Sequence, residues 1–270
     1  MNEVLQLGLV INTWQQPDYL SRVLRAVSAQ SSLPNEVLLA DDGSQDQTAD
    51  LFNQWAARQR LATAHVWQEH LGFRRAGILN QAIARAKSQY LVFLDGDTIP
   101  HPDFIADHRR LARPAAFIQG HRALVGHRAA AWFGLGSPGA DRWRALSSLQ
   151  VRGLKHTFRW PHPLIRVRAD LRGVRGCNLG IWREHLVQVN GYNEAFVGWG
   201  REDSELALRL MNRGVQRLDV RGWIVCFHLW HPPASRAALP QNDDLLAQAQ
   251  RSRATRCDNG LNRYLAAHHE

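Results

Sequence analysis

Residues 90–100, YLVFLDGDTIP, run five apolar residues directly into two aspartates, Asp95 and Asp97, which are separated by one glycine. A short continuous apolar run is typical of a strand that is buried on both faces, as in a parallel sheet. Two carboxylates at the end of such a strand repel each other, and a divalent cation placed between them and a ligand relieves that repulsion. A solvated turn is the alternative, and the position after a buried strand disfavours it.

Upstream of this stretch, strand and helix patterns alternate. In the helix patterns apolar residues recur at spacings of three and four, whereas the strands are short apolar runs that end at turn residues. This alternation predicts an α/β fold: a mostly parallel, Rossmann-like sheet flanked by helices. The expected strands are residues 7–12, 36–40, 63–67, 90–94 and 116–119, and the expected helices are residues 17–29, 46–60 and 76–86.

Glycine and proline interrupt this alternation over residues 122–175, here called the arginine-rich segment. We expect an excursion with partial helix there, and a partly mobile one. Order is expected to resume with a strand at 177–182, helices at 183–189 and 202–213, a strand at 223–229 and surface helices from 241. We predict one domain, 1–270, made of an N-terminal half (1–121), the arginine-rich segment and a C-terminal half (176–270).

Composition narrows the class of protein. No window approaches the roughly 18 apolar residues of a membrane-spanning helix. The first residues, MNEVLQLGLVINTW, lack the features of a secretory signal, so we expect a cytoplasmic protein. The cysteines Cys177, Cys226 and Cys257 are odd in number and widely spaced, which indicates neither a disulfide framework nor a structural zinc site.

The net charge of +9 is concentrated in one part of the chain. Residues 122–183 hold 12 basic and 2 acidic side chains, whereas the stretches before and after them are nearly balanced. Nearly all the basic residues are arginine, whose forked donors suit phosphate and carboxylate groups, so an anionic partner is expected. A nucleic-acid-binding protein is one such reading. It leaves the acidic clusters unexplained, and we expect no nucleic acid.

A second acidic pair, Asp41 and Asp42, also follows an apolar strand. In open α/β sheets, ligands bind in the crevice beyond the carboxyl ends of the strands, where both pairs would lie. A sugar nucleotidyltransferase also uses paired acids on a parallel sheet. That reading requires a glycine-rich, basic signature near the amino terminus, and residues 7–20 contain one glycine and no basic side chain.

Three stretches, INTWQQPDYL, EVLLADDGSQDQT and ILNQAIARAKSQYLVFLDGDTIP, resemble in order and spacing the donor half of the family 2 glycosyltransferases with the GT-A fold. The resemblance spans about the first 105 residues. It implies that Asp41 and Asp42 hold the uridine of a UDP-sugar. It also implies that Asp95 faces the ribose or the metal, and that Asp97 binds a divalent metal, usually manganese (or magnesium), that engages the diphosphate.

The first motif departs from the family pattern of proline, threonine and tyrosine, since it has Asn12, Thr13 and Trp14. We assign Thr13 and Trp14 to the nucleotide site, where Trp14 would stack on uracil, with core packing as the alternative. Arg74 or Arg75 would lie near the first turn of the third helix and could reach a phosphate. Arg74 is the assigned residue, and a solvated arginine pair is the alternative.

In the second half, RGCNLG, NGYNE and GWGREDSE are similar to the acceptor half of galactosyltransferase-type and chondroitin-polymerase-type members. The resemblance implies that Asp203 is the catalytic base. Glu202 is assigned beside it, and Asn178, Trp199 and Gly200 are assigned to substrate binding. Both acids also open a helix, where the helix dipole favours ionised carboxylates. Helix-start chemistry alone explains the acids but not the Gly-Trp-Gly before them.

Two late histidines, His228 and His231, resemble the place where the family supplies a histidine to the metal. Imidazole and carboxylate together suit manganese, which accepts nitrogen and oxygen ligands. His231 is the first choice, and His228 is a ligand or a core histidine.

These features predict a metal-dependent, inverting glycosyltransferase that moves a hexose or N-acetylhexosamine from a UDP-sugar to a saccharide or anionic glycolipid in bacterial-type cell-surface polysaccharide or lipopolysaccharide synthesis. The arginine-rich segment would receive the acceptor or contact an anionic membrane peripherally, on its cytoplasmic face.

Overall fold

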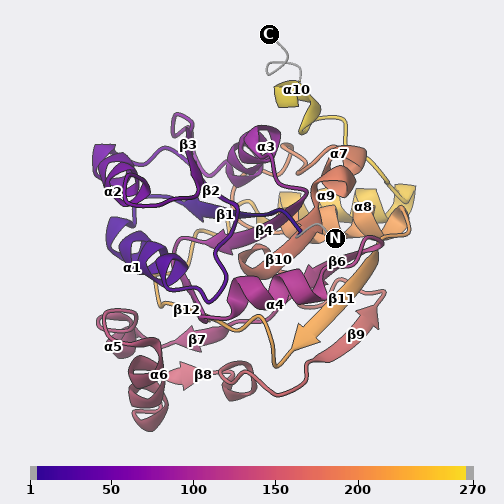
Figure 1. Cartoon of the computed structure of the whole chain (residues 1–270). Coiled ribbons are helices and arrows are strands. Elements are labelled where there is room, and N and C mark those ends of the chain that lie inside the picture. The colour runs from indigo at the N-terminus through magenta and orange to yellow at the C-terminus, as the bar shows by residue number, and fades with distance from the viewer. Residues whose placement is uncertain (1–4, 266–270) are drawn as a thin grey trace.

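The computed structural model describes residues 5–265, and within them eight strands form a central sheet in the order β3-β2-β1-β4-β10-β6-β11-β9 (Figure 1). Strands β1 to β4 are parallel neighbours, as the alternating pattern predicts. The bounds are β1 (Leu7–Thr13), β2 (Glu36–Asp41), β3 (Ala62–Trp67), β4 (Tyr90–Asp95), β6 (Ala116–Gln119), β9 (Leu164–Arg168), β10 (Leu179–Trp182) and β11 (Gln216–Arg221).

The register of the parallel strands brings the two acidic motifs to one edge. Strand β1 lies between β2 and β4, with Thr13 opposite Asp41 and Asn12 opposite Asp95. The carboxyl ends of β1, β2 and β4 therefore meet, and the loops that follow them form the candidate site.

Alternate residues of β4 enter two different hydrophobic clusters. Tyr90, Val92 and Leu94 pack in a cluster with α1, whereas Leu91 and Phe93 pack in a cluster with α3. The strand is thus buried on both faces, which is why its sequence reads as a continuous apolar run rather than an alternating one.

A smaller second sheet, in the order β5-β12-β7-β8, lies beside α5 and α6 at one end of the molecule (Figure 1). In it His228 on β12 pairs antiparallel with Thr98 on β5, the residue after Asp97. The strand expected at residues 223–229 is shorter than predicted, since it spans Cys226–His228, and it belongs to this smaller sheet. Its strands are β5 (Thr98–Pro100), β7 (Ala123–Val125), β8 (Val151–Arg152) and β12 (Cys226–His228).

Helices cover both faces of the large sheet, and among the described residues none is long and apolar enough to cross a membrane (Figure 1). The α/β fold class is confirmed, although β10 and β9 run antiparallel to their neighbours. The helices are α1 (Pro17–Ser28), α2 (Asp46–Ala56), α3 (Arg75–Arg85), α4 (Phe104–Leu111), α5 (His127–Ala130), α6 (Pro138–Ser147), α7 (Arg183–Val189), α8 (Glu202–Asn212), α9 (Leu239–Ser252) and α10 (Asn262–Leu265).

The arginine-rich segment contains α5, α6, a short 3₁₀ helix (Leu154–His156) and strands β7, β8 and β9. The partial helix was expected, and the strands were not. The sequence reading also lacked β11, because its Arg217 and Asp219 are charged although both side chains are buried. Arg217 donates to the carbonyls of Asp170 and Arg172, which satisfies its charge inside the protein. The mobility of the segment stays a prediction.

Candidate active site

Asp97, His228 and His231 come together beyond the end of β4. The antiparallel pairing of β5 with β12 places His228 Nε2 3.5 Å from Asp97 Oδ1, and His231 Nε2 lies 3.2 Å from Asp97 Oδ2. One possible ligand atom from each residue lies within 4.8 Å of the others. Residues from distant parts of the sequence thus form one group of three potential metal ligands.

The electrostatics of this group suit a divalent cation. Burial, followed by the negative charge of Asp95, raises the pKa of Asp97 to about 7. Burial, followed by the charge of Arg122, lowers the pKa of His228 to about 3, so its imidazole is neutral and keeps a lone pair. His231 Nδ1 lies 2.7 Å from the Pro232 carbonyl, which only accepts, so Nε2 is left free to bind a metal. The donor set of two imidazoles and one carboxylate fits manganese better than magnesium, which prefers oxygen ligands.

Asp95 lies outside this group of ligands. Its Oδ1 accepts from Arg75 at 3.4 Å. Both roles expected for Asp95, facing the ribose or the metal, stay predictions.

Arg75 joins three acids from two distant parts of the chain, the end of β4 and the first turn of α8. Its buried guanidinium donates to Asp203 Oδ1 at 2.8 Å, to Glu202 Oε1 at 3.3 Å and to Asp95. The charges of these acids raise the pKa of Arg75 further above its usual range although burial opposes this. The sequence analysis considered both arginines and assigned Arg74, because nothing in a helix start shows which side chain turns inward.

Asp203 is held on both oxygens. Oδ1 faces Arg75, and Oδ2 accepts from the Gly176 backbone N–H at 2.7 Å. The turn before α8 has positive φ angles at Gly198, Gly200 and Arg201, a backbone that the two glycines adopt without strain. This turn lets α8 begin at Glu202 with both acids in its first turn.

Glu202 is the more buried acid of the pair. Burial, followed by the charge of Asp203, raises its pKa to about 7. Asp203 is the more accessible of the two adjacent acids and is held by Arg75 and the Gly176 N–H, whereas Glu202 lies behind it.

The aspartates of the DDGS turn are tied to the protein. Asp41 is fully buried, and it bonds to the Ser44 N–H and to His65 Nε2 at 2.9 and 3.0 Å. No atom of Asp41 reaches the surface in this conformation, and its expected contact with uridine stays a prediction. Asp42 accepts from Gln68 Nε2 and from the Arg74 backbone N–H, and its contact with uridine stays a prediction.

Trp14 is 49% exposed, which excludes the alternative of core packing. Its ring stacks on His70 with centroids 4.7 Å apart and planes 13° apart. The indole thus already accepts one flat partner, and stacking on uracil stays a prediction. Thr13 is buried next to Gly96, and its hydroxyl has no hydrogen-bond partner among the described residues.

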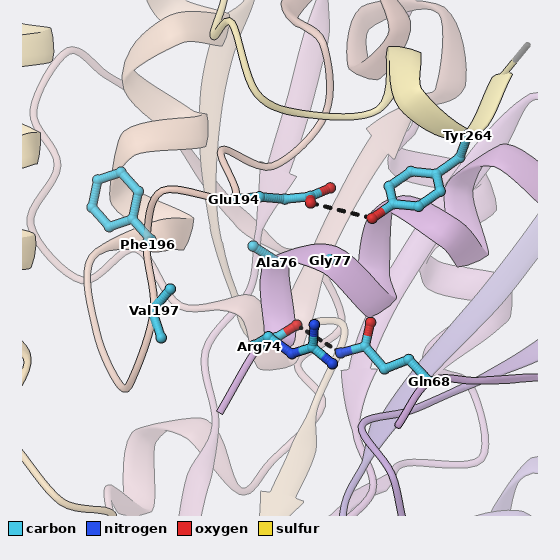
Figure 2. A pocket seen from close by; sticks show the side chains of 8 residues that line it. All are labelled: Gln68, Arg74, Ala76, Gly77, Glu194, Phe196, Val197 and Tyr264. Atoms are coloured by element: carbon cyan, nitrogen blue, oxygen red, sulfur yellow. Dashed lines mark hydrogen bonds between the residues drawn. The ribbon is translucent and has the colours of Figure 1, made fainter. Parts of the chain in front are cut away.

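Arg74 lies away from the metal group. Its Nη2 donates to the Glu69 carbonyl, and its carbonyl accepts from Gln68 Nε2 at 3.2 Å. Figure 2 shows it in a small pocket opposite Glu194, which bonds to Tyr264. No contact in the structure supports its assigned role at a phosphate.

The arginine that faces the metal group is Arg122, a residue that sequence reasoning did not single out. Its charge acts on Asp95, Asp97 and His228, and Nη1 donates to Cys177 Sγ at 3.3 Å. Arg122 is the first residue of the arginine-rich segment, so charge composition indicated the region but not the side chain.

The three residues assigned to substrate binding differ in access. Trp199 is partly exposed under the guanidinium of Arg236, 5.5 Å from it, and Gly200 lies in the turn before α8. Asn178 is fully buried, and its amide donates to the carbonyls of His121 and Ile224. The side chain thus holds neighbouring loops together and does not face the solvent, and the assignment of Asn178 to substrate binding stays a prediction.

Two family models match this chain. The model described as Glycosyl transferase family 2 matches residues 9–132, and the model described as N-terminal domain of galactosyltransferase matches residues 161–231. The first match contains the acids at the ends of β2 and β4. The second contains Asp203, His228 and His231.

Curated relatives agree with these matches. Validoxylamine A glucosyltransferase of Streptomyces hygroscopicus subsp. limoneus is 28% identical over 77% of this chain and 48% of the relative. Chondroitin synthase of Escherichia coli is 23% identical over 80% of this chain and 34% of the relative. The chain thus spans about half the length, or less, of these relatives.

Solved structures share the fold at low identity. Staphylococcus aureus TarS residues 1–349 in complex with UDP-GlcNAc superposes with a TM-score of 0.65 at 13% identity, covering 97% of this chain and 71% of that one. A mannosyltransferase from Pyrobaculum calidifontis, in complex with GDP-Man and Mn2+, gives 0.57 at 18% identity, covering 98% and 69%.

Proposed function

Because this chain belongs to glycosyl transferase family 2 and has the GT-A fold, we propose that it is a metal-dependent, inverting hexosyltransferase that uses a UDP-sugar. The observation that carries the proposal is the arrangement at the carboxyl edge of the sheet. A three-residue metal group lies there together with Asp203, an acid anchored by Arg75 and the Gly176 N–H. The metal group suits the binding of a diphosphate, and Asp203 suits the acceptance of a proton from a hydroxyl.

Asp97, His228 and His231 would hold manganese or magnesium, which when bound supplies positive charge for the diphosphate leaving group. Asp203 would accept the proton of an acceptor hydroxyl as its oxygen attacks the anomeric carbon from the face opposite the diphosphate. The bond from that carbon to the diphosphate oxygen breaks, and the configuration inverts. One base and one displacement suffice, so no protein nucleophile is required.

Arg75 and Gly176 fix the direction in which Asp203 presents its remaining lone pairs. Each oxygen of Asp203 has one protein donor and retains capacity for one more hydrogen bond. A carboxylate held at both oxygens keeps one orientation, which positions it toward the reacting hydroxyl without a search over rotamers.

We propose a UDP-sugar as the donor, and a thermal-stability measurement distinguishes this donor from a GDP-sugar. Relatives in this fold are described with either nucleotide sugar. We expect UDP with manganese to raise the melting temperature, because a ligand that binds only the folded state stabilises it by mass action, about 2.7 kcal/mol at a hundredfold excess over Kd. GDP with manganese, and UDP with a chelator, are the matched controls. Equal stabilisation by GDP would contradict the UDP assignment.

We propose a saccharide or an anionic glycolipid as the acceptor, received by the arginine-rich segment. Some of the relatives are polysaccharide synthases, chondroitin synthase and hyaluronan synthase, which supports a role in cell-surface polysaccharide or lipopolysaccharide synthesis. The segment also exposes large apolar side chains, which together with its arginines suits a peripheral membrane contact. These are Leu124, Leu135, Trp143, Leu149, Leu154, Leu164 and Val167.

The membrane contact predicts salt-sensitive binding to anionic vesicles. Arginine near an anionic surface contributes on the order of 1 kcal/mol per side chain, and salt screens this attraction. We expect sedimentation with phosphatidylglycerol vesicles at low salt and release at about 1 M salt, with neutral phosphatidylcholine vesicles as the control. Absence of the protein from the anionic vesicle pellet at low salt would leave a soluble saccharide as the acceptor.

A further inference from the structure

A second cavity, of about 410 Å³, lies between α1, the ends of β5 and β12, and the loop that joins α5 to α6. Its volume is in the range of ligand pockets, about 300–1,000 Å³. Ile99, Phe133 and Phe227 give it an apolar wall, in which the two phenylalanine rings are 5.1 Å apart. The residues assigned individually to donor, metal and substrate do not line it, although its lining from Phe133 to Arg142 belongs to the arginine-rich segment.

The cavity lies on the opposite side of the β5–β12 ladder from the metal group. Ile99 pairs with Phe227, and the next pair along is Thr98 with His228. Successive side chains of a strand point to opposite faces. His228 turns toward Asp97, and Ile99 and Phe227 line the cavity behind it. The cavity is therefore separate from the proposed active site.

Charge in the cavity is predominantly positive. Arg22, Arg25 and Arg142 line it with a single acid, Asp141. Asp141 is occupied, because its Oδ2 accepts from the backbone N–H groups of Gly134 and Gly136 at 2.9 and 3.0 Å. The wall thus carries more positive than negative charge, with the acid already bonded.

The three arginines differ in how they are used. Arg22 and Arg25 donate to backbone carbonyls of the α5–α6 loop, among them those of Ala130 and Gly134. Arg142 lies against the rings of Trp143 and Phe158, at 5.7 and 5.6 Å. Its buried Nε has no hydrogen-bond partner among the residues that the structure describes. No acid among the described residues pairs with Arg142, so its guanidinium charge remains available to an anion.

We propose that this cavity binds an amphipathic anion: an alkyl chain against Ile99, Phe133 and Phe227, with a phosphate or carboxylate head at Arg142. A free sugar matches the cavity poorly, because Ile99, Phe133 and Phe227 form an apolar wall, and His101 is the one hydrogen-bonding side chain in the lining besides the arginines and Asp141. The apolar side chains of Leu135 and Trp143, which are 54% and 60% exposed, adjoin lining residues Gly134, Gly136 and Arg142 in sequence. The ligand can therefore be a free amphiphile or a lipid taken from a bilayer.

The test uses decyl phosphate below its critical micelle concentration, titrated into the full chain by calorimetry. We expect saturable binding of one molecule per chain. Inorganic phosphate keeps only the anionic head and decanol keeps only the alkyl chain. Each should therefore bind at least about tenfold more weakly than decyl phosphate. Micromolar binding of inorganic phosphate alone, or no binding of decyl phosphate up to millimolar concentration, would overturn the proposal.

Two variants assign the binding to this cavity. Ala29 lines the cavity from the exposed end of α1, so Ala29→Phe fills the space from the surface and should weaken decyl phosphate binding at least about tenfold. Arg142→Gln should weaken decyl phosphate similarly and leave decanol unchanged. Arg144→Gln, on the same helix but packed on Trp132, is the matched control. Decyl phosphate affinity that is equal in Ala29→Phe and the wild type would place the binding elsewhere.

Vesicles distinguish the two sources of the ligand. If the cavity takes its ligand from a bilayer, Ala29→Phe should also weaken binding to phosphatidylglycerol vesicles. If the ligand is a free amphiphile, Ala29→Phe should bind decyl phosphate more weakly and still bind vesicles like the wild type. Either result supports the cavity as a site for an amphipathic anion.

Discussion

Asp203→Asn is expected to lower kcat about a thousandfold or more while Mn2+-dependent UDP binding stays within about twofold of the wild type. General base catalysis contributes about 10²–10⁴-fold, and the amide has no basic site to receive the proton of the acceptor hydroxyl. The substitution keeps the shape of the side chain and leaves an oxygen for the Gly176 N–H. The measurement is UDP release with an acceptor that the wild type uses, together with calorimetry of UDP.

The matched control for this variant is Asp243→Asn. Asp243 is an exposed acid that pairs with Arg201, the residue just before α8. It contacts none of the proposed reacting groups. Its turnover should stay within about twofold of the wild type. An Asp203→Asn enzyme with a tenth or more of wild-type turnover would show that another group is the base.

Arg75→Met is expected to destabilise the protein by about 3–5 kcal/mol, because removal of one partner leaves uncompensated buried charge. The side chains of Asp95, Glu202 and Asp203 would then face one another without the cation that separates them. Urea unfolding measures the loss. Arg74→Met is the control: the half-buried Arg74 side chain makes one hydrogen bond among the described residues, to the Glu69 carbonyl, and its loss should change stability by less than about 1 kcal/mol.

The destabilisation caused by Arg75→Met should increase with pH. The pKa of Glu202 is already raised to about 7 with Arg75 present, and loss of the cation raises it further. A carboxyl whose folded-state pKa is raised favours folding below its unfolded value, and that contribution is lost as pH rises through the folded value. The deficit of Arg75→Met relative to wild type should therefore be small near pH 4.5 and large at pH 8. A deficit that is constant over this range would contradict a role in neutralising the acids.

The donor half was predictable because its signals are local. The apolar run of β4, the turn residues after β2 and the three-and-four spacing in α1 each fix an element within a few residues. Once these strands are parallel neighbours, the acids that follow them must meet at one edge. The gathering of His228 and His231 at Asp97 was expected only from a family resemblance, and the structure brings these side chains together.

The remaining features depend on pairings that no local pattern encodes. Arg75 turns inward because acids from β4 and α8 surround it, and both lie far away in the sequence. Asn178 and Asp41 read as polar site residues, but each satisfies buried backbone or side-chain groups. Strand β11 was missed because its buried Arg217 is neutralised by tertiary contacts rather than by exposure.

A divalent cation held by Asp97, His228 and His231 is the central requirement of the proposed mechanism. Calorimetry of UDP binding with and without manganese tests this requirement. We predict that manganese tightens UDP binding at least about tenfold in the wild type, and that Asp97→Ala and His231→Ala abolish this gain. His185→Ala, which alters a half-buried histidine that bonds to the Pro114 carbonyl, should keep this gain. UDP affinity that is the same with manganese and with a chelator, or a manganese effect that survives Asp97→Ala, would contradict the account.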